Sequence, residues 1–360
     1  MTEPADLALE QVTKVFAGHR AVDGVNFAVR RGEFFSILGP SGCGKTTLMR
    51  MIAGFEMPSS GEISIRGQSM LGVPSNRRPV NMVFQNLALF PMMNVGENVA
   101  YGLACQGVGR AEREARAVRI LERVGLPGYE ERQVTQLSGG QRQRVAIARC
   151  LVLEPTLLLL DEPLGALDLK LREHMKLELK QLQGAFNTTF IYITHDQSEA
   201  LVMSDRVAVM NKGCFEQIGS PRELYHHPAT NFVAGFVGDA NAWDVTPNPS
   251  LGPGLGVTLV SGADLRAHGR IGAVGHAYLR PEAIALAARI EELSGLPNRF
   301  HGKVSAVLFD GAASNLVIEA EGFAPHIRAT LPQAGALAGV EVGARLAFGF
   351  SAEAVKVFPA

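Results

Sequence analysis

Short apolar runs alternate with helical patterns from the start of the chain to about Phe236. This alternation predicts an α/β fold, in which helices flank a parallel sheet. The predicted strands are Phe34–Leu38, Val80–Phe84, Leu157–Leu160, Phe190–Thr194 and Val207–Met210, and the predicted helices are Thr46–Ala53, Arg110–Val124, Gly140–Leu153 and Leu169–Gly184.

Two other patterns accompany this core. Leu7–Phe16, Ala21–Val29 and Glu62–Arg66 indicate antiparallel strands. Pro91–Leu153 is mostly helical in pattern, so we expect it to form a subdomain that projects from the sheet.

The composition changes after Phe236. Proline and glycine punctuate a loop-rich stretch at Pro247, Pro249, Gly252, Pro253 and Gly254. Short alternating runs beyond it predict a small all-β unit, a barrel or a sandwich, with strands at Gly302–Phe309, Leu316–Glu319, His326–Leu331 and Arg345–Phe350. The expected domains are therefore 1–240, with a helical subdomain at about 91–153, and 241–360.

Composition narrows the class of protein. Hydrophobic residues make up 47% of the 360 residues and charged residues 19%, which suits a globular protein with a sizeable core. The net charge of −1 gives no bulk attraction to nucleic acid, so we expect no nucleic-acid partner. The four cysteines lack a C-x-x-C pair and are expected to be reduced thiols of a cytosolic protein: Cys43, Cys105, Cys150 and Cys214.

Targeting signals are also absent from the pattern. The first residues show no basic-then-apolar block, so no secretory signal is predicted. No apolar run approaches the roughly 18–20 residues that span a bilayer, so a membrane role would come through a partner.

A phosphate-binding loop is predicted at Gly39–Thr46, with the sequence GPSGCGKT between a strand and a helix. Gly39, Gly42 and Gly44 would let backbone N–H groups face phosphate oxygens, and the following helix would direct its dipole at the same anion. Lys45 would neutralise the β- and γ-phosphates, and Thr46 would offer its hydroxyl to magnesium. A chance glycine-rich turn is the alternative, and the strand–loop–helix context disfavours it.

Two adjacent carboxylates end the run LLLLDEP. A buried strand that ends in Asp161 would bring this carboxylate near the magnesium of the phosphate loop. Glu162 points elsewhere along the pleat and could polarise an attacking water as general base. Two solvated charges at a strand end are the simpler alternative, but the four preceding leucines favour a buried strand.

Leu137 opens LSGGQRQRVAIARCL, the most specific pattern in the chain. We expect Ser138, Gly139 and Gly140 at a helix N-terminus that is free to bind an anion. An ordinary capped helix explains Ser-Gly-Gly alone, but a phosphate loop in the same chain indicates ATP held from two directions. The apolar face that such a helix needs follows at Val145, Ile147, Ala148 and Leu151.

The ordered set of motifs resembles the ATP-binding cassette (ABC) transporter ATPases. The matching motifs are GPSGCGKT, VFQN with Gln85, LSGGQ at Leu137–Gln141, LLLLDEP, GALD at Gly165–Asp168 and ITHD with His195. The resemblance covers roughly Leu7 to Ala242. It implies a P-loop NTPase cassette with a RecA-like parallel core and with antiparallel β and α-helical subdomains.

The resemblance implies a role for each matching position. Phe16 would stack on adenine, and Asp168 would cross a dimer interface. Thr46, Gln85 and Asp161 would hold Mg²⁺, while Glu162, His195 and Gln85 would act on the attacking water. ATP would contact Gly39, Pro40, Ser41, Gly42, Cys43, Gly44, Lys45, Thr46 and Thr47 of one copy, and Leu137, Ser138, Gly139, Gly140 and Gln141 of the other.

The resemblance also implies partners. Two copies would pack head to tail with ATP between each phosphate loop and the facing LSGGQ, so that ATP binding favours closure and hydrolysis favours reopening. Two transmembrane permease subunits would convert this switch into alternating access, and a periplasmic solute-binding protein would act indirectly. The expected location is the cytoplasmic face of the cell inner membrane, as a peripheral subunit.

Importers match this chain better than other branches of the family. Exporters often carry transmembrane helices, ribosome-associated members two cassettes and repair members long coiled coils, and this sequence shows none of these features. Its C-terminal part is similar to the OB-like TOBE domain of bacterial importer ATPases, with YLRPEAI at Tyr278–Ile284.

The solute is suggested by resemblance alone. Stretches such as RPVNMVFQNLALFP and FIYITHDQSEALVMSDRVAVMNKG look most like the polyamine (spermidine/putrescine) importer members. Leu87 and Met92–Met93 depart from the usual residues where the permease should dock. Iron, sulfate, thiamine or a sugar stay open as solutes, and so does a soluble ATP-switched regulator.

Overall fold

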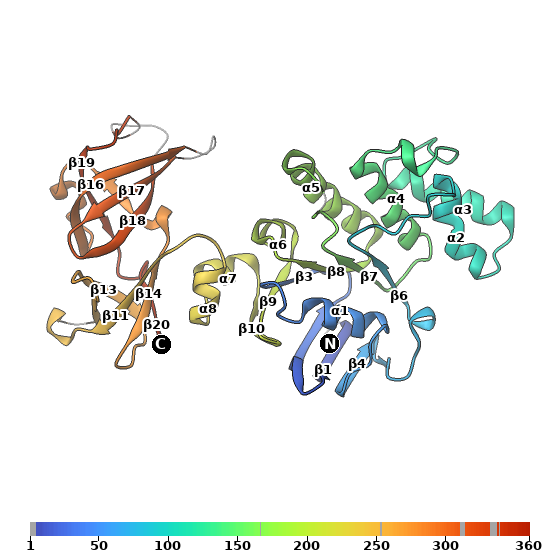
Figure 1. Cartoon of the computed structure of the whole chain (residues 1–360), viewed down its shortest axis with the longest axis horizontal. Helices are drawn as coiled ribbons and strands as arrows, with labels where there is room; N and C mark the ends of the chain where they lie inside the picture. The colour runs from blue at the N-terminus through green and yellow to red at the C-terminus, as the bar shows by residue number, and fades with distance from the viewer. Residues whose placement is uncertain (1–4, 166, 253, 310–313, 332–336, 338) are drawn as a thin grey trace. The chain divides into compact units, whose positions relative to one another are not determined.

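The computed structural model describes residues 5–165, 167–252, 254–309, 314–331, 337 and 339–360 (Figure 1). The chain divides after Leu224 into two compact units. Residues 225–240, placed in the first domain by the sequence analysis, belong to the second unit because α8 (Asn231–Phe236) contacts β14 (Gly275–Leu279) and β20 (Lys356–Pro359).

A six-stranded sheet forms the centre of the first unit, in the order β10-β9-β3-β8-β7-β6. All its strands except β10 are parallel, and the five predicted strands are confirmed to within one residue at each end. Their bounds are β3 Phe34–Leu38, β6 Val80–Val83, β7 Leu157–Asp161, β8 Thr189–Thr194, β9 Arg206–Asn211 and β10 Cys214–Gly219.

Successive residues of each central strand enter different cores. Phe34 packs into one buried cluster and Phe35 into another, and Leu158 and Leu159 divide in the same way. Side chains alternate across a strand, so a sheet that is covered on both faces needs apolar residues at every position. This explains why these strands are uninterrupted apolar runs.

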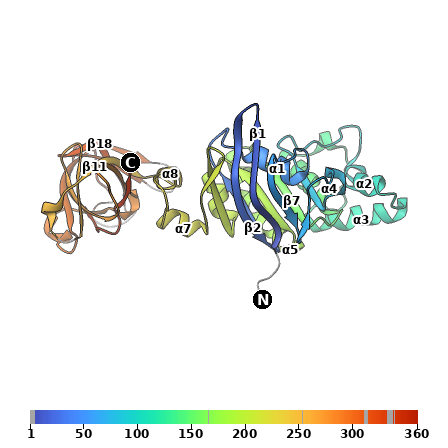
Figure 2. The same cartoon turned by 90° about the horizontal axis from the view of Figure 1, so that it is seen from below.

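Helices cover one face of this sheet, and the other face carries a helix and a second sheet (Figures 1 and 2). The first face is covered by α4 Gly139–Leu151, α5 Leu169–Phe186 and α6 Gln197–Met203, and α2 Val95–Cys105 and α3 Arg110–Arg123 pack against α4. The second face carries α1 Lys45–Ala53 and an antiparallel sheet in the order β2-β1-β4-β5, with β1 Ala5–Phe16, β2 His19–Arg30, β4 Ser60–Ile65 and β5 Gln68–Ser69.

The stretch predicted as a helical subdomain is largely helical. It contains α2, α3, the short η2 (Val134–Gln136) and α4, and these three α-helices contact one another. Figure 1 places α2 and α3 beyond the edge strand β6. The remaining short helices of the first unit are η1 Ser75–Arg77 and α7 Pro221–His226, the latter crossing into the second unit.

The second unit is all-β apart from short helical turns, as predicted. It combines a closed barrel, β11-β12-β13-β20-β14, with a five-stranded sheet, β15-β19-β16-β17-β18. Aromatic rings of the sheet, including Phe300, Phe323 and Phe348, pack in a core that also takes side chains from the barrel. The other bounds are β11 Asn241–Pro247, η3 Pro249–Leu251, β12 Leu255–Leu259, β13 Asp264–Gly269, η4 Pro281–Ala283, β15 Ala285–Ala287, η5 Ile290–Leu293, β16 Asn298–Phe309, β17 Ser314–Ala320, β18 Phe323–Leu331 and β19 Arg345–Phe350.

In the part of the chain that the structure describes, no helix combines the length and the apolar character needed to cross a bilayer.

Candidate active site

Lys45 is the first residue of α1, and its side chain folds back over the loop between β3 and α1. Its side chain is buried, and its Nζ atom donates hydrogen bonds to the carbonyl oxygens of Gly39 at 2.8 Å and Pro40 at 2.9 Å. The loop therefore curls around the ammonium group. An anion that entered the curl would meet a positive charge already in place.

Glycine is required in this loop for two different reasons. A Cβ at Gly39 would lie 2.2 Å from the carbonyl oxygen of Met210, and one at Gly44 would lie 2.2 Å from that of Ala21. Gly42 faces open space, but its φ of +78° lies in the left-handed region that favours glycine. The close packing at Gly39 and Gly44 is against the chain's own backbone, whereas the sequence analysis invoked only the approach of phosphate.

The N-terminus of α1 is open to an anion. Its N-cap is Gly44, no side chain caps it, and its first turn holds no acidic residue. The first backbone N–H groups of a helix have no partners within the helix and carry its positive dipole end. Ser41 and Thr46 are exposed beside this end, while Cys43 is buried. Burial raises the pKa of the Cys43 thiol, although the charge of Lys45 acts against it.

Asp161 is the last residue of β7, and the positive charge of Lys45 acts on its carboxyl group. Burial raises the pKa of its carboxyl, the charge of Glu162 raises it further, and Arg50 and Lys45 lower it. β7 and β3 flank β8 on its two sides, so their carboxyl ends lie at one edge of the sheet. This edge therefore combines a cation with a half-buried carboxylate.

Glu162 and His195 meet at the same edge. The Oε2 atom of Glu162 lies 3.1 Å from the Nδ1 atom of His195, and the side chains are 24% and 60% exposed. Both groups can thus reach solvent and each other. The backbone of Glu162 has a φ of +44°, and its N–H donates to the carbonyl oxygen of Ile193 at 3.0 Å. Such a conformation is uncommon for a residue other than glycine.

Gln85 lies in the exposed loop that follows β6. Its Nε2 atom is 3.8 Å from the position that a Cβ would take at Gly165, so it borders the segment that follows Glu162. Phe16 is 43% exposed at the end of β1, and the ammonium of Lys14 lies 4.8 Å from the centre of its ring. A flat exposed ring of this kind can receive another ring.

Ser138 is the N-cap of α4, as predicted. Its hydroxyl accepts from the backbone N–H of Gln141 at 3.3 Å, and the Oε1 atom of Gln141 accepts from the N–H of Ser138 at 2.9 Å. The Nε2 atom of Gln141 donates to the hydroxyl of Tyr129 at 3.1 Å. Leu137 is buried before this cap, and a Cβ at Gly140 would lie 3.3 Å from Leu171 of α5.

Asp168 is the N-cap of α5, and its Oδ1 atom accepts from the backbone N–H of Leu171 at 2.9 Å. Ala166 of the GALD motif lies outside the described residues. Within the described part of the chain, no hydrogen bond or ion pair joins residues 137–141 to residues 39–47. A single copy therefore presents two separate helix N-termini, at Lys45 and at Gly139.

Two residues of these surroundings were missed from the sequence. Tyr129 and Arg172 contact Gln141 and Asp196, respectively. Tyr129 sits in an irregular loop, where no periodicity points to its neighbours. Arg172 lies four residues after Asp168, and only this helical spacing could have suggested it.

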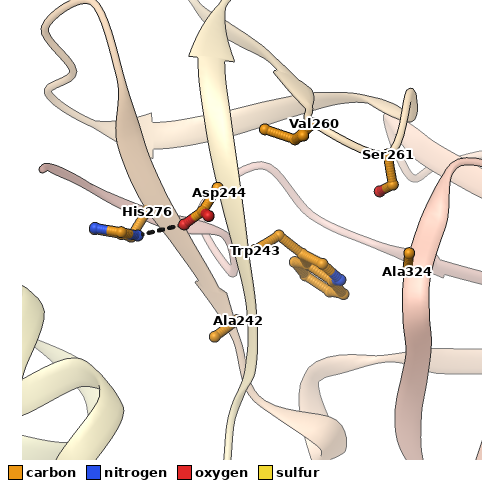
Figure 3. A pocket seen from close by; sticks show the side chains of 7 residues that line it. All are labelled: Ala242, Trp243, Asp244, Val260, Ser261, His276 and Ala324. Carbon is orange, nitrogen blue, oxygen red and sulfur yellow. Dashed lines mark hydrogen bonds and ion pairs between the residues drawn. The ribbon is translucent and has the colours of Figure 1, made fainter.

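The second unit carries a cavity of its own, about 450 Å³ in volume. Figure 3 shows Trp243 directed toward Ser261 and Ala324, while His276 and Asp244 meet on the other side, 2.8 Å apart. The lining residues are Ala242, Trp243, Asp244, Val260, Ser261, His276 and Ala324. This cavity is built from residues of the second unit alone.

Comparison with known proteins finds a matching family model in each of the two units. The family model described as ABC transporter matches residues 22–165, and the family model described as TOBE domain matches residues 277–358. The spermidine/putrescine import ATP-binding protein PotA of Trichodesmium erythraeum is 48% identical over 316 residues, which cover 85% of this chain and 82% of that protein. YdcT of Escherichia coli, an uncharacterized ABC transporter ATP-binding protein, is 50% identical over 313 residues, which cover 87% and 86%.

A solved structure shows the same cassette with products bound. It is the dimeric post-hydrolysis state of the ATP-binding cassette MJ0796 with ADP and Pi. Its TM-score is 0.52 at 32% sequence identity, and the match covers 60% of this chain and 99% of that chain.

Proposed function

Because this chain belongs to the ABC transporter family, we propose that it is the motor subunit of a bacterial importer and couples ATP hydrolysis to polyamine uptake. The chain is an ABC-type ATPase with a TOBE domain. Spermidine and putrescine are the proposed solutes because the relative from T. erythraeum is named as an import ATP-binding protein for them. The alignment covers most of this chain and most of that protein.

ATP would be held first by the loop around Lys45. The ammonium now bonded to Gly39 and Pro40 would turn to the β- and γ-phosphates, and the uncapped start of α1 would add backbone N–H groups. The same phosphates would be reached by residues from Ser41 to Thr47, and the exposed ring of Phe16 would stack on adenine.

Magnesium is the expected partner of the nucleotide. Thr46, Gln85 and Asp161 would supply hydroxyl, amide and carboxylate oxygens, the donors that Mg²⁺ prefers. Its charge would neutralise the phosphate oxygens as the terminal phosphate departs. The fit rests on the donors present at this sheet edge and on the field of Lys45 and Arg50 at Asp161.

Hydrolysis would depend on Glu162, and the observation that carries this assignment is its 3.1 Å contact with His195. The carboxylate would accept a proton from the attacking water, and the imidazole would orient that carboxylate and contact the γ-phosphate. Gln85, at the border of the same segment, would contact the water from the other side.

The functional unit would be a head-to-tail dimer. Among the described residues of one copy, no hydrogen bond or ion pair joins the helix end at Ser138 to the loop around Lys45, so we infer that the two would receive the same ATP from different copies. Residues 137–141 of one copy would then face residues 39–47 of the other, with Asp168 at the interface. Support comes from the dimeric ADP- and Pi-bound relative.

Two permease subunits would receive the motion, and a solute-binding protein outside the membrane would deliver the solute to them. The chain would act as a peripheral subunit at the cytoplasmic face of the inner membrane. Two exposed apolar side chains support such a docking surface, because Phe84 precedes Gln85 and its ring centre lies 6.1 Å from that of Phe55.

Uptake by cells tests the solute assignment. A strain that lacks this chain should lose uptake of radiolabelled spermidine or putrescine, and the wild-type gene should restore it. Uptake of sulfate, iron, thiamine or a sugar that fails instead would reassign the solute. Intact uptake of all of these, with no membrane protein co-purifying, would contradict the importer role and favour an ATP-switched regulator.

A further inference from the structure

Arg172 of α5 joins the loop before that helix to the loop that carries His195. Its Nη2 atom donates to the carbonyl oxygen of Leu167 at 3.1 Å, and its backbone N–H donates to that of Asp168 at 2.9 Å. Its Nη1 atom lies 3.5 Å from the Oδ2 atom of Asp196, the residue after His195. One guanidinium thus touches both loops.

The far side of this connection is firmly held. Asp196 caps α6 by accepting from the backbone N–H groups of Ser198 at 2.8 Å and Glu199 at 3.2 Å. Glu199 is buried, and its Oε2 atom accepts from the hydroxyls of Thr194 at 2.6 Å and Tyr192 at 2.8 Å. A shift of Asp196 would therefore move the end of β8 and the start of α6 together.

One donor of this network, the Nε atom of Arg172, does not form a hydrogen bond with any residue that the structure describes. The Nε atom of Arg172 is buried and has no hydrogen-bond partner among the described residues, and it lies 3.9 Å from the Oε1 atom of Glu199. An N–H···O bond needs about 2.7–3.2 Å, so a small approach of α5 to α6 would close it. A buried donor without a partner is unfavourable, which supplies a reason for a second arrangement.

We propose that Arg172 is a positioning residue that couples the Asp168 loop to His195, so that arrival of the opposite copy sets the hydrolytic histidine. This inference rests on the proposed function, in which Asp168 meets that copy and His195 acts on hydrolysis. Docking at Asp168 displaces the start of α5, the open Arg172–Glu199 bond closes, and Asp196 carries the change to His195. The two bond states provide the two-state element that such coupling requires.

The fold does not depend on this guanidinium alone. Lys176, one turn further along α5, is buried and bonds Ser198 of α6 and Glu173. It holds the two helices together through these bonds, and its charge also acts on Asp196. Arg172→Lys, which keeps the charge but loses the planar fork, is therefore expected to fold.

A double-mutant cycle on the full chain tests the coupling. ATP hydrolysis is measured for wild type, Asp168→Ala, Arg172→Lys and the double variant. Each single variant should lower kcat by about 10-fold with little change in KM, and the double variant should be no slower than the slower single variant. Multiplied effects in the double variant would overturn the coupling.

Arg144→Lys is the matched control. Arg144 also pairs with a glutamate, Glu178 of α5, and its side chain is 24% exposed against 25% for Arg172, but its hydrogen bonds within the described residues go to Glu178 and Gly125 and to neither loop. Its effect should multiply with that of Asp168→Ala. If it deviates from multiplication as strongly as Arg172→Lys does, the effect is general to α5 and the proposal is wrong.

Two more variants separate the possible failures. Asp196→Asn keeps a good N-cap but loses the charge facing Arg172, so it should reproduce the non-additivity with Asp168→Ala even if Arg172→Lys does not fold. His195→Ala should nearly abolish hydrolysis. Full activity of His195→Ala would refute the proposed function, whereas inactive His195→Ala with a multiplicative Asp168–Arg172 cycle would refute only the coupling.

Discussion

The Oε2 atom of Glu162 lies 3.1 Å from the Nδ1 atom of His195, although the two residues follow different strands. Register brings them together, because Asp161 of β7 pairs with Ile193 of β8 in a parallel arrangement. Each strand is thus followed by one polar residue, and both residues lie at the same edge of the sheet. The two residues are more than thirty positions apart in the sequence, and the pairing of β7 with β8 brings them together without a motif of fixed spacing.

Glu162→Gln should abolish most hydrolysis while leaving ATP binding intact. The amide cannot accept the proton of the attacking water, and loss of a general base lowers kcat by about 10²–10⁴-fold. ATP-loaded protein should accumulate as a dimer, which size-exclusion chromatography with ATP would detect.

Glu154→Gln is the control for that variant. Glu154 also has a positive φ, +53°, but it lies in an exposed loop after α4. Its rate should match wild type. A Glu162→Gln protein that hydrolyses ATP at the wild-type rate would refute the general-base assignment.

Lys45→Ala should weaken ATP binding. Hydrogen bonds to charged groups contribute about 1.5–3 kcal/mol, which corresponds to roughly a 10- to 100-fold rise in Kd. Titration calorimetry with ATP measures it. Lys180→Ala, which removes a half-exposed ammonium paired with Asp205, should leave Kd unchanged, and an unchanged Kd for Lys45→Ala would exclude the phosphate-loop role.

Gly39→Ala should destabilise the protein more than Gly42→Ala. A methyl group at residue 39 would clash with the carbonyl oxygen of Met210, whereas at residue 42 it meets open space and only the left-handed backbone opposes it, at about 1–2 kcal/mol. Urea unfolding gives both free energies. Equal losses would show that the close approach at Gly39 is relieved by a backbone shift.

Tyr129→Phe should weaken the dimer that Glu162→Gln accumulates. The variant removes the acceptor that holds the Gln141 amide in place, a bond worth about 1 kcal/mol, so the dimer Kd should rise by at most roughly 5-fold, through a less ordered Gln141. Sedimentation of the Glu162→Gln protein with ATP measures it. Tyr101→Phe, on the surface of α2, is the control. Unchanged association would mean that the capping box orients Gln141 without Tyr129.

The central sheet could be predicted because burial on both faces leaves an unmistakable pattern. Runs such as FFSIL and LLLL have no polar interruption, and their ends were placed within one residue. The barrel strands were missed. β11 and β12 are short and flank a turn rich in proline and glycine, of which Pro253 lies outside the described residues, and the barrel closes only through distant pairing of β20 with β13 and β14.

The sequence predicted the individual motifs of the candidate site, but it did not predict the contacts between segments that are distant in the sequence. The phosphate loop and the Ser138 cap each occupy one continuous stretch, so local chemistry is enough to recognise them. The Arg172–Asp196 contact and the Tyr129–Gln141 bond join separate segments. The packing against Met210 and Ala21 that demands glycine in the loop is equally non-local.

The capping box at Ser138 means that two backbone N–H groups of the proposed second anion site already have partners before any phosphate arrives. Ser138 and Gln141 already exchange two hydrogen bonds, so an incoming γ-phosphate that took the N–H groups of these two residues would replace internal partners there. Net gains from exchanged hydrogen bonds are small. If this helix end faces the ATP of another copy, the capping box would re-form when the phosphate leaves, which would favour release of that copy.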